Sequence, residues 1–486
     1  MRLYQNGVFH TMASAEHTAK AILEDKGIIK DLFDEIPPRI DAERVDVGGC
    51  HVYPGFIDTH THSFEAGIYS FGADLNEAKD LEGVFSRLAE ARPLGGKVFA
   101  YRFDENALRE KRFPTVEELD RVLPSIPLFL RRVDGHSGMV NTAAYKKIPW
   151  STPPRPGVLK GRANSEASFW FHTSLSEEAI LKVYHAAAAQ AVAGGHTVVH
   201  TMIGNGRTDP MHYRLIRDHL AEFSVEFILY PQITDVKTCI ELGSPRIGGC
   251  ICADGSFGSH TAFLSEPYTD MPETRGEPYH TQDFWDALVR EAWTAGLQVA
   301  VHAIGDGAIE QIVTAYEKNA SLSKGRSLSE IIHNELLTPD LLKRESRLGI
   351  AAVMQPMFDR LWGGESQMYA RVLGKERALS CNRLASLVRN GVLVTGGSDW
   401  YITEIDAGKG IDAATRLHNS AEALSPFEAV MLYTKNAAQL SGDEDRFGCL
   451  LPGFEANFSC LSEDILSPGK SVTAQVVSVY RKGNKL

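Results

Sequence analysis

A regular alternation of short apolar segments and amphipathic segments runs through the middle of this 486-residue chain. Residues 298–302 (QVAVH) predict a buried strand, and residues 308–316 repeat apolar side chains at helical spacing. Residues 330–333 (EIIH) predict the next strand, and Thr338-Pro339 is a typical start for the helix after it. Repeated strand–helix units over about 380 residues predict an α/β fold, a (β/α)8 TIM barrel.

Other apolar segments continue this pattern. We expect strands at 54–60, 97–101, 127–131, 196–200, 226–230, 350–355 and 392–395. One more strand near 247–253 belongs either to the barrel or to an excursion from it. In a TIM barrel the functional side chains gather at the C-terminal ends of the strands, because all of these ends open on the same face. Candidate ligands are therefore expected at strand ends.

The two ends of the chain have a different pattern, in which apolar and polar residues alternate between turn signals. Asn6-Gly7 is a hairpin signal near the N-terminus, and residues 473–480 alternate near the C-terminus. We expect both ends to build one small β-sandwich domain, from residues 1–51 and 440–486. Residues 52–439 are expected to form the catalytic barrel, with insertions.

Composition and charge argue against several classes of partner. The net charge is −12 without a long basic run, so neither nucleic acid nor an anionic membrane is expected. We find no run of about 18 apolar residues that would predict a transmembrane helix, and no signal-peptide pattern at the start. Seven scattered cysteines indicate a reduced, cytoplasmic protein rather than a disulfide framework.

Five potential metal ligands lie at the ends of expected strands. His60 and His62 stand two residues apart in the sequence PGFIDTHTH, so on a strand both point to the same face. His302 and His333 end two later strands, and Asp399 follows the last one. Imidazole and carboxylate are common zinc ligands. A single strand-end histidine is usually a packing residue, but five such residues at matching strand ends predict a metal site.

Motifs that cover nearly the whole chain suggest a family. They are PGFIDTHTH (54–62), RRVDGHSGMVN (131–141), ADGSFGSHTAFLSEPYTD (253–270), VAVHAIGDGAI (299–309), IIHNELL (331–337), VMQPMF (353–358), GGSDW (396–400) and FGCLLPGFEANF (447–458). With these motifs the chain resembles the amidohydrolase superfamily, and in particular its YtcJ-like branch of N-substituted formamide deformylase-type hydrolases. The resemblance implies a metal-bearing (β/α)8 barrel and hydrolysis of a C–N bond, usually an amide.

The resemblance also assigns roles to the five strand-end residues. It implies that His60 and His62 bind the more buried metal and that His302 and His333 bind a second one. Asp399 would bind the first metal and the attacking water. The implied cofactor is a divalent metal, with Zn²⁺ as the expected ion, one or two per chain.

The position of the family's bridging lysine is the largest departure from the family pattern. In the family this lysine carries a carboxylate from CO2 and bridges two metals, but here Cys250 occupies the position. A thiolate binds zinc well and can bridge two metals. Cys250 and Cys252 are two residues apart and share a face on a strand, so one interpretation makes one of them, with Cys250 favoured, a ligand in place of the lysine. A cysteine sulfur, however, lies much closer to the backbone than a carboxylated lysine tip. The other interpretation makes Cys250 a buried packing residue beside a single metal.

These features together predict a metal-dependent amidohydrolase that cleaves a non-peptide C–N bond of a small-molecule substrate. A bound metal would lower the pKa of its water toward ~7, and Asp399 would be the general base. One alternative is a single-metal deaminase-type hydrolase that acts on a ring amidine. A more remote one is a non-catalytic scaffold on the same fold. The family suggests a homodimer.

Several further residues are expected near the substrate. The resemblance makes His136 a site residue that holds the substrate carbonyl or oxyanion. Gln355 and Trp400 lie next to strand ends and are expected to line the pocket. Residues 256–283 form a long stretch rich in proline and glycine with little periodicity, and we expect this loop to cover the mouth of the barrel.

Overall fold

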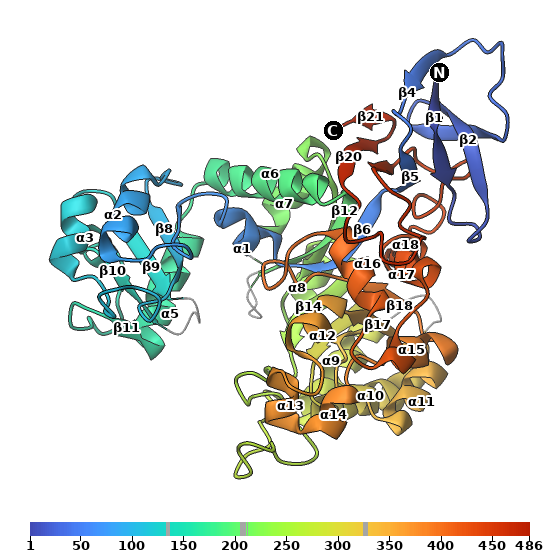
Figure 1. Ribbon diagram of the computed structural model, residues 1–486. Helices are drawn as coiled ribbons and strands as arrows, with labels where there is room; N and C mark the ends of the chain where they lie inside the picture. The colour runs from blue at the N-terminus through green and yellow to red at the C-terminus, as the bar shows by residue number, and fades with distance from the viewer. Residues whose placement is uncertain (133–136, 205–209, 211, 324–328) are drawn as a thin grey trace. The chain divides into compact units, whose positions relative to one another are not determined.

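The computed structural model describes residues 1–132, 137–204, 210, 212–323 and 329–486 (Figure 1). The chain divides into two compact units. One comprises Ser63–Ala187, and the larger one comprises Met1–His62 together with Ala188–Leu486. Among the described helices, none has the length and apolar character needed to cross a membrane.

Parallel strands in the larger unit carry the candidate ligands. A three-stranded sheet has the order β13-β12-β6, with β6 (Phe56–Thr61), β12 (His196–Ile203) and β13 (Glu226–Pro231). A five-stranded sheet follows the order β14 (Arg246–Cys252), β15 (Gln298–Ala303), β16 (Glu330–His333), β17 (Ala351–Met354) and β18 (Val394–Gly396). Ile57, Val198, Ala300 and Val353 from these strands belong to one buried core. The strands predicted at these places are thus confirmed.

The two parallel sheets approach each other at both edges without joining into one ladder. At one edge Thr61 and Trp400 form an isolated parallel bridge. At the other, the side-chain amide of Gln232 donates a 2.8 Å hydrogen bond to the carbonyl of Cys250. The fold is therefore α/β and TIM-barrel-like. The predicted closed barrel is not present as a continuous ladder in the described residues, because one edge is joined by an isolated backbone bridge and the other by a side-chain hydrogen bond.

Helices connect the parallel strands, as the sequence pattern predicted. Thr338 caps α11 (Pro339–Leu348) by accepting a hydrogen bond from the backbone N–H of Leu341, and Gly349 ends the helix with a φ of 67°. α10 (Asp306–Asn319) buries Ile309 and Ile312 on one face. The remaining α-helices that lie wholly in this unit are α7 (Tyr213–Asp218), α8 (Val236–Glu241), α9 (Gln282–Thr294), α12 (Pro356–Trp362), α13 (Met368–Leu373), α14 (Lys375–Leu379), α15 (Leu384–Arg389), α16 (Ala407–Thr415), α17 (Pro426–Leu432) and α18 (Lys435–Ser441).

Both ends of the chain build one mixed sheet in the larger unit, where the blue and red strands of Figure 1 lie together. The strands are β1 (Arg2–His10), β2 (Thr18–Asp25), β3 (Ile28–Phe33), β4 (Glu43–Asp46), β5 (His51–Pro54), β19 (Phe458–Leu461), β20 (Val476–Arg481) and β21 (Asn484–Lys485). Their order is β21-β20-β19-β5-β1-β2-β3, with β4 beside β1. The described strands form a single sheet, so the predicted β-sandwich is not confirmed. The boundaries 1–51 and 440–486 remain a prediction.

The smaller unit contains a separate sheet with the order β11-β10-β9-β8-β7. Its strands are β7 (Ala73–Asp74), β8 (Val98–Phe103), β9 (Leu128–Arg132), β10 (Ser137–Val140) and β11 (Leu159–Lys160). The helices that begin in it are α1 (Ser63–Ile68), α2 (Leu81–Glu90), α3 (Val116–Val122), α4 (Thr142–Tyr145), α5 (Gly161–Thr173) and α6 (Glu177–Ala193). The strands expected at 97–101 and 127–131 exist, but their assignment to the barrel was wrong. A buried apolar run predicts a strand without indicating its sheet.

Candidate metal centre

His60, His62 and Asp399 meet where the first and last parallel strands end. His60 lies on β6, His62 follows it, and Asp399 follows β18. Oδ1 of Asp399 lies 3.3 Å from Nε2 of both histidines. His60 is fully buried, and neither of its ring nitrogens has a hydrogen-bond partner among the described residues. Two imidazole nitrogens directed at one carboxylate oxygen, with one ring otherwise unsatisfied, fit a divalent metal.

Asp58 holds these two strand ends together. Its buried carboxylate accepts hydrogen bonds from the backbone N–H groups of His60 at 3.0 Å and Ser398 at 3.1 Å. Burial raises the pKa of Asp58 to about 7. Asp399 has a φ of 51°, in the left-handed region that non-glycine residues rarely adopt. Such backbone conformations cluster at functional sites and need support from the surroundings, which Asp58 supplies here.

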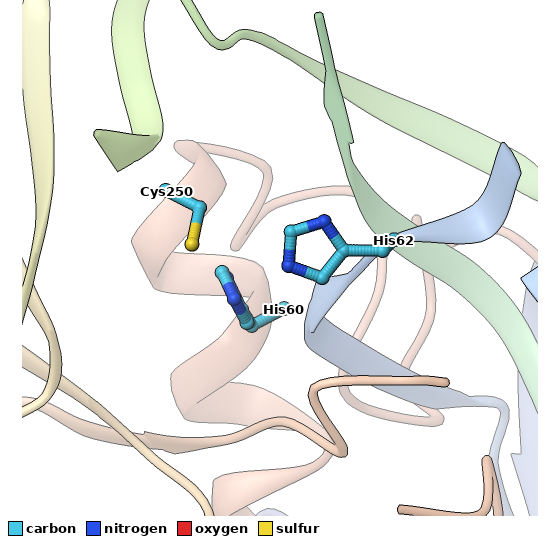
Figure 2. Close-up of side chains that lie close together, drawn as sticks. All are labelled: His60, His62 and Cys250. Atoms are coloured by element: carbon cyan, nitrogen blue, oxygen red, sulfur yellow. The ribbon is translucent and has the colours of Figure 1, made fainter. Parts of the chain in front are cut away.

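A second group consists of His302 on β15 and the thiols of Cys250 and Cys252 on β14. The potential ligand atoms of these three residues all lie within 4.8 Å of one another. Cys250 also forms such a group with His60 and His62, and Figure 2 shows the three side chains converging. A hydrogen bond with Cys250 lowers the pKa of the Cys252 thiol to about 6 although burial opposes this. Cys250 thus belongs to both groups, while its role as a ligand remains a prediction.

A bulge in β14 explains how the short cysteine side chain reaches this position. Gly248 pairs with Ala300 on β15, but the next pair joins Ile251 to Val301, so two residues of β14 are left out of the ladder. Gly248 and Gly249 have φ values of +96° and +105°, which L side chains rarely adopt. A bulge re-aims the bulged residues, which accounts for the short side chain of Cys250 lying near His60 and His62. Cys250 also packs against the buried core, so both interpretations of this residue remain open.

Asp254 orients His302. Nε2 of His302 lies 3.5 Å from Oδ1 of Asp254 and 3.1 Å from the carbonyl oxygen of Gly255. The carboxylate is fully buried and accepts hydrogen bonds from the backbone N–H groups of Phe263, Ile304 and Gly305. Burial alone would lower the pKa of His302, but Cys252 and Asp254 raise it to about 10. An outer carboxylate of this kind fixes the ring of a metal-binding histidine.

His333 at the end of β16 faces both groups. Its ring centroid lies 4.5 Å from that of His302 and 5.5 Å from that of His60. Its potential ligand atom is within 4.8 Å of those of His60 and Asp399. Nδ1 of His333 is buried without a hydrogen-bond partner among the described residues, and its φ is 70°. The structure therefore brings His333 to the centre, while its assignment to the second metal remains a prediction.

A largely apolar cavity of about 380 Å³ lies against these ligands. Its walls include Phe257, Phe358 and Trp362, of which Phe257 comes from the loop expected over the mouth. Glu335 adds a carboxyl group that accepts a hydrogen bond from the Tyr369 hydroxyl, and burial raises the pKa of Glu335 to about 8. A cavity of this size and polarity suits a small, mainly apolar molecule with few polar groups.

Three residues predicted to touch the substrate differ in how the structure places them. His136 lies outside the described residues. Gln355 and Trp400 are 1% and 7% exposed and do not belong to the described lining of the cavity. The backbone carbonyl of Trp400 accepts a 2.6 Å hydrogen bond from the backbone N–H of His62, and the neighbouring residues Tyr401 and Ile402 line the cavity. Substrate contacts by Gln355 and Trp400 remain predictions.

The sequence interpretation missed Asp58 and Asp254. Both were visible as carboxylates close to predicted ligands, since Asp58 is two residues before His60 and Asp254 is two residues after Cys252. Their role depends on which backbone N–H groups they accept hydrogen bonds from, and several of these lie just beyond the ends of distant strands. Tyr401 and Ile402 were missed because the apolar pattern of a strand does not show which way side chains point beyond the end of that strand.

The parallel strands carry imidazole, thiolate and carboxylate groups at one set of strand ends, beside an apolar cavity. This arrangement defines a barrel-type hydrolase. Residues 43–485 match the profile of the Amidohydrolase family, and the chain belongs to that family. The predicted resemblance to the amidohydrolase superfamily is therefore confirmed.

Individual relatives support the YtcJ-like branch. The chain is 27% identical to the putative amidohydrolase YtcJ of Bacillus subtilis (strain 168), over 95% of this chain and 94% of that protein. It is 24% identical to N-substituted formamide deformylase of Arthrobacter pascens, over 98% and 96%. A crystal structure of an uncharacterized metal-dependent hydrolase from Pyrococcus furiosus aligns with a TM-score of 0.83 and 26% identity, covering 96% of this chain and 100% of that one.

Proposed function

We propose that this protein is a metal-dependent amidohydrolase that cleaves a non-peptide C–N bond of the amide type in a small, mainly apolar molecule. The observation that carries the proposal is the convergence of six side chains beside the cavity: His60, His62, Cys250, His302, His333 and Asp399. Membership of the Amidohydrolase family and the similarity to N-substituted formamide deformylase support the reaction class.

The donor set fits Zn²⁺. His60, His62 and Asp399 would hold one metal, His302 and His333 a second, and Cys250 would be shared between them. Imidazole and thiolate donors favour Zn²⁺ over Mg²⁺ or Ca²⁺, which prefer oxygen ligands. A bound ion of this kind polarises a carbonyl and lowers the pKa of a bound water toward ~7.

Asp399 is the proposed proton carrier. Burial alone would raise its pKa, but the imidazoles of His60 and His62 lower it below the usual value, so Asp399 is a carboxylate at neutral pH. It accepts a proton from the attacking water and returns it to the departing nitrogen. The apolar walls of the cavity hold the acyl or amine substituent of the substrate and limit access of bulk water.

The test combines metal content with product analysis. Metal per chain is measured by elemental analysis, and the zinc-loaded protein is assayed with N-alkyl and N-aryl formamides and acetamides. We expect a carboxylic acid and an amine in equal amounts. Asp399→Asn should lower turnover by roughly 10²–10⁴-fold, whereas Asp445→Asn, which changes an exposed carboxylate, serves as the matched control. No turnover of any amide by the metal-loaded protein would overturn the proposal, and ammonia release from ring amidines would favour a deaminase-type reaction.

A further inference from the structure

We propose that Cys252 is a second thiolate ligand, so that His302, Cys250 and Cys252 together hold the second metal. This inference rests on the proposed metal-dependent function and extends it. The bridging position of the family is occupied by Cys250, and nothing in the family pattern gives a ligand role to Cys252. A sulfur-rich second site would make the protein selective for thiophilic ions such as Zn²⁺ or Co²⁺ over Mn²⁺ or Mg²⁺.

Strand register brings Cys252 and His302 together. Cys252 is the direct partner of His302 in the parallel ladder of β14 and β15. Side chains directly opposite each other on neighbouring strands project to the same face of the sheet. Cys252 therefore stands beside the candidate ligand His302 because of the backbone pairing, independently of the bulge that places Cys250.

The distances fit one metal ion. The sulfur atoms of Cys250 and Cys252 and one ring nitrogen of His302 lie within 4.8 Å of one another. Two thiolates bound to one tetrahedral zinc, with Zn–S bonds of about 2.3 Å, stand roughly 3.8 Å apart. The three atoms need only small movements to reach this geometry.

The surroundings of His302 indicate which nitrogen is the ligand. Nε2 faces the Gly255 carbonyl at 3.1 Å and the Asp254 carboxylate at 3.5 Å, so this nitrogen carries the proton. Nδ1 lies 3.9 Å from the sulfur of Cys250, on the side of the thiols. His302 would therefore bind the metal through Nδ1.

Cys250 and Cys252 also differ from the other cysteines of the chain. Both line the cavity and are partly accessible, whereas the remaining five are buried elsewhere. The Cys252 thiol donates a hydrogen bond of 3.6 Å to the carbonyl of Cys250. Its proton would be released when the sulfur binds a metal.

The experiment counts metal–sulfur bonds. The protein is loaded with Co²⁺, and the near-ultraviolet sulfur-to-cobalt charge-transfer absorbance and the cobalt content per chain are measured for wild type, Cys250→Ser, Cys252→Ser and the control Cys449→Ser. If Cys250 bridges two ions and Cys252 binds one, three Co–S bonds exist. Cys252→Ser should then lose about one third of the absorbance and Cys250→Ser about two thirds, while the control loses none. Circular dichroism checks that each variant is folded.

The outcomes separate this inference from the proposed function. Undiminished absorbance and cobalt content in Cys252→Ser would overturn the ligand role of Cys252 and leave the amidohydrolase proposal intact. The expected loss together with no amide hydrolysis by wild type would support the ligand and overturn the activity. A wild-type protein without sulfur-to-cobalt absorbance would overturn the thiolate site altogether. Should Cys252→Ser fail to fold, Cys252→Ala is measured in the same way.

Discussion

Replacing Gly248 with alanine tests whether the bulge in β14 delivers Cys250 to the metal ligands. Gly248 has a φ of +96°, and holding an L-residue in such a conformation costs roughly 1–3 kcal/mol. A Cβ atom at this position would stand 2.1 Å from the carbonyl oxygen of Ala300, whereas ordinary contacts begin at 3.4 Å. Because the obstacle is backbone, β14 and β15 must separate by about 1.3 Å, the difference between these distances.

This separation weakens both the ladder and the metal centre. A lost backbone hydrogen bond costs a net ~0.5–1.5 kcal/mol, so the free energy of unfolding should fall by roughly 1.5–4.5 kcal/mol in total. Ala300 lies two residues before His302, and the shift therefore moves His302 relative to Cys250. Metal–ligand distances tolerate deviations of only about 0.2 Å, so the second metal should be lost.

Calorimetric unfolding and elemental analysis after dialysis measure the two effects of Gly248→Ala. The matched control is Gly243→Ala, because Gly243 has a φ of +68° but no atom within 4 Å of the added Cβ. The control should lose some stability and keep its metal. Equal unfolding temperatures and equal metal contents in the two variants would refute the reasoning that the bulge positions the thiol.

Three further predictions follow from the described contacts. Asp399→Asn should lower turnover by roughly 10²–10⁴-fold with an unchanged circular dichroism spectrum, and near-normal turnover would exclude Asp399 as the proton carrier. Tyr369→Phe removes the hydroxyl that donates to buried Glu335, so stability should fall by about 1–3 kcal/mol; an unchanged unfolding temperature would contradict this. Burial lowers the pKa of His196 from 6.5 to about 4, so the folded state takes up fewer protons and loses stability as pH falls from 6.5 toward 4. Between pH 7 and pH 5 the free energy of unfolding should fall by about 2 kcal/mol because of His196. Calorimetric unfolding should show this part of the fall in wild type and not in His196→Leu.

The sequence predicted the strands that carry the ligands better than the sheets to which they belong. The strand at 298–302 and the helix start at Thr338-Pro339 are confirmed, because burial and capping leave local signals. The segments at 97–101 and 127–131 have the same apolar character as barrel strands but pair in the smaller unit. Pairing depends on contacts between distant segments, which a local pattern does not contain.

The ligands themselves were predictable for a similar reason. His60, His302 and His333 each end a strand, and the end of a strand is a local property. The reach of Cys250 was not predictable, because it depends on two left-handed glycines and on the register between β14 and β15. In the sequence Gly248-Gly249-Cys250 the only sign of the bulge is a pair of adjacent glycines. Such a pair is equally typical of an ordinary turn.

The way in which the first and last parallel strands meet connects the fold to the metal centre. At this edge the described strands share one isolated bridge rather than a ladder, and single backbone hydrogen bonds and polar side chains add further contacts. The Thr59 and Thr395 hydroxyls lie 2.9 Å apart, and Asp58 accepts from the backbone of Ser398. Burying a carboxylate costs free energy unless hydrogen-bond donors surround it. Asp58 therefore favours the single arrangement of strand ends that supplies these donors. That arrangement sets the distance between His60 and Asp399, and closure of the strands and assembly of the metal ligands are therefore the same structural event.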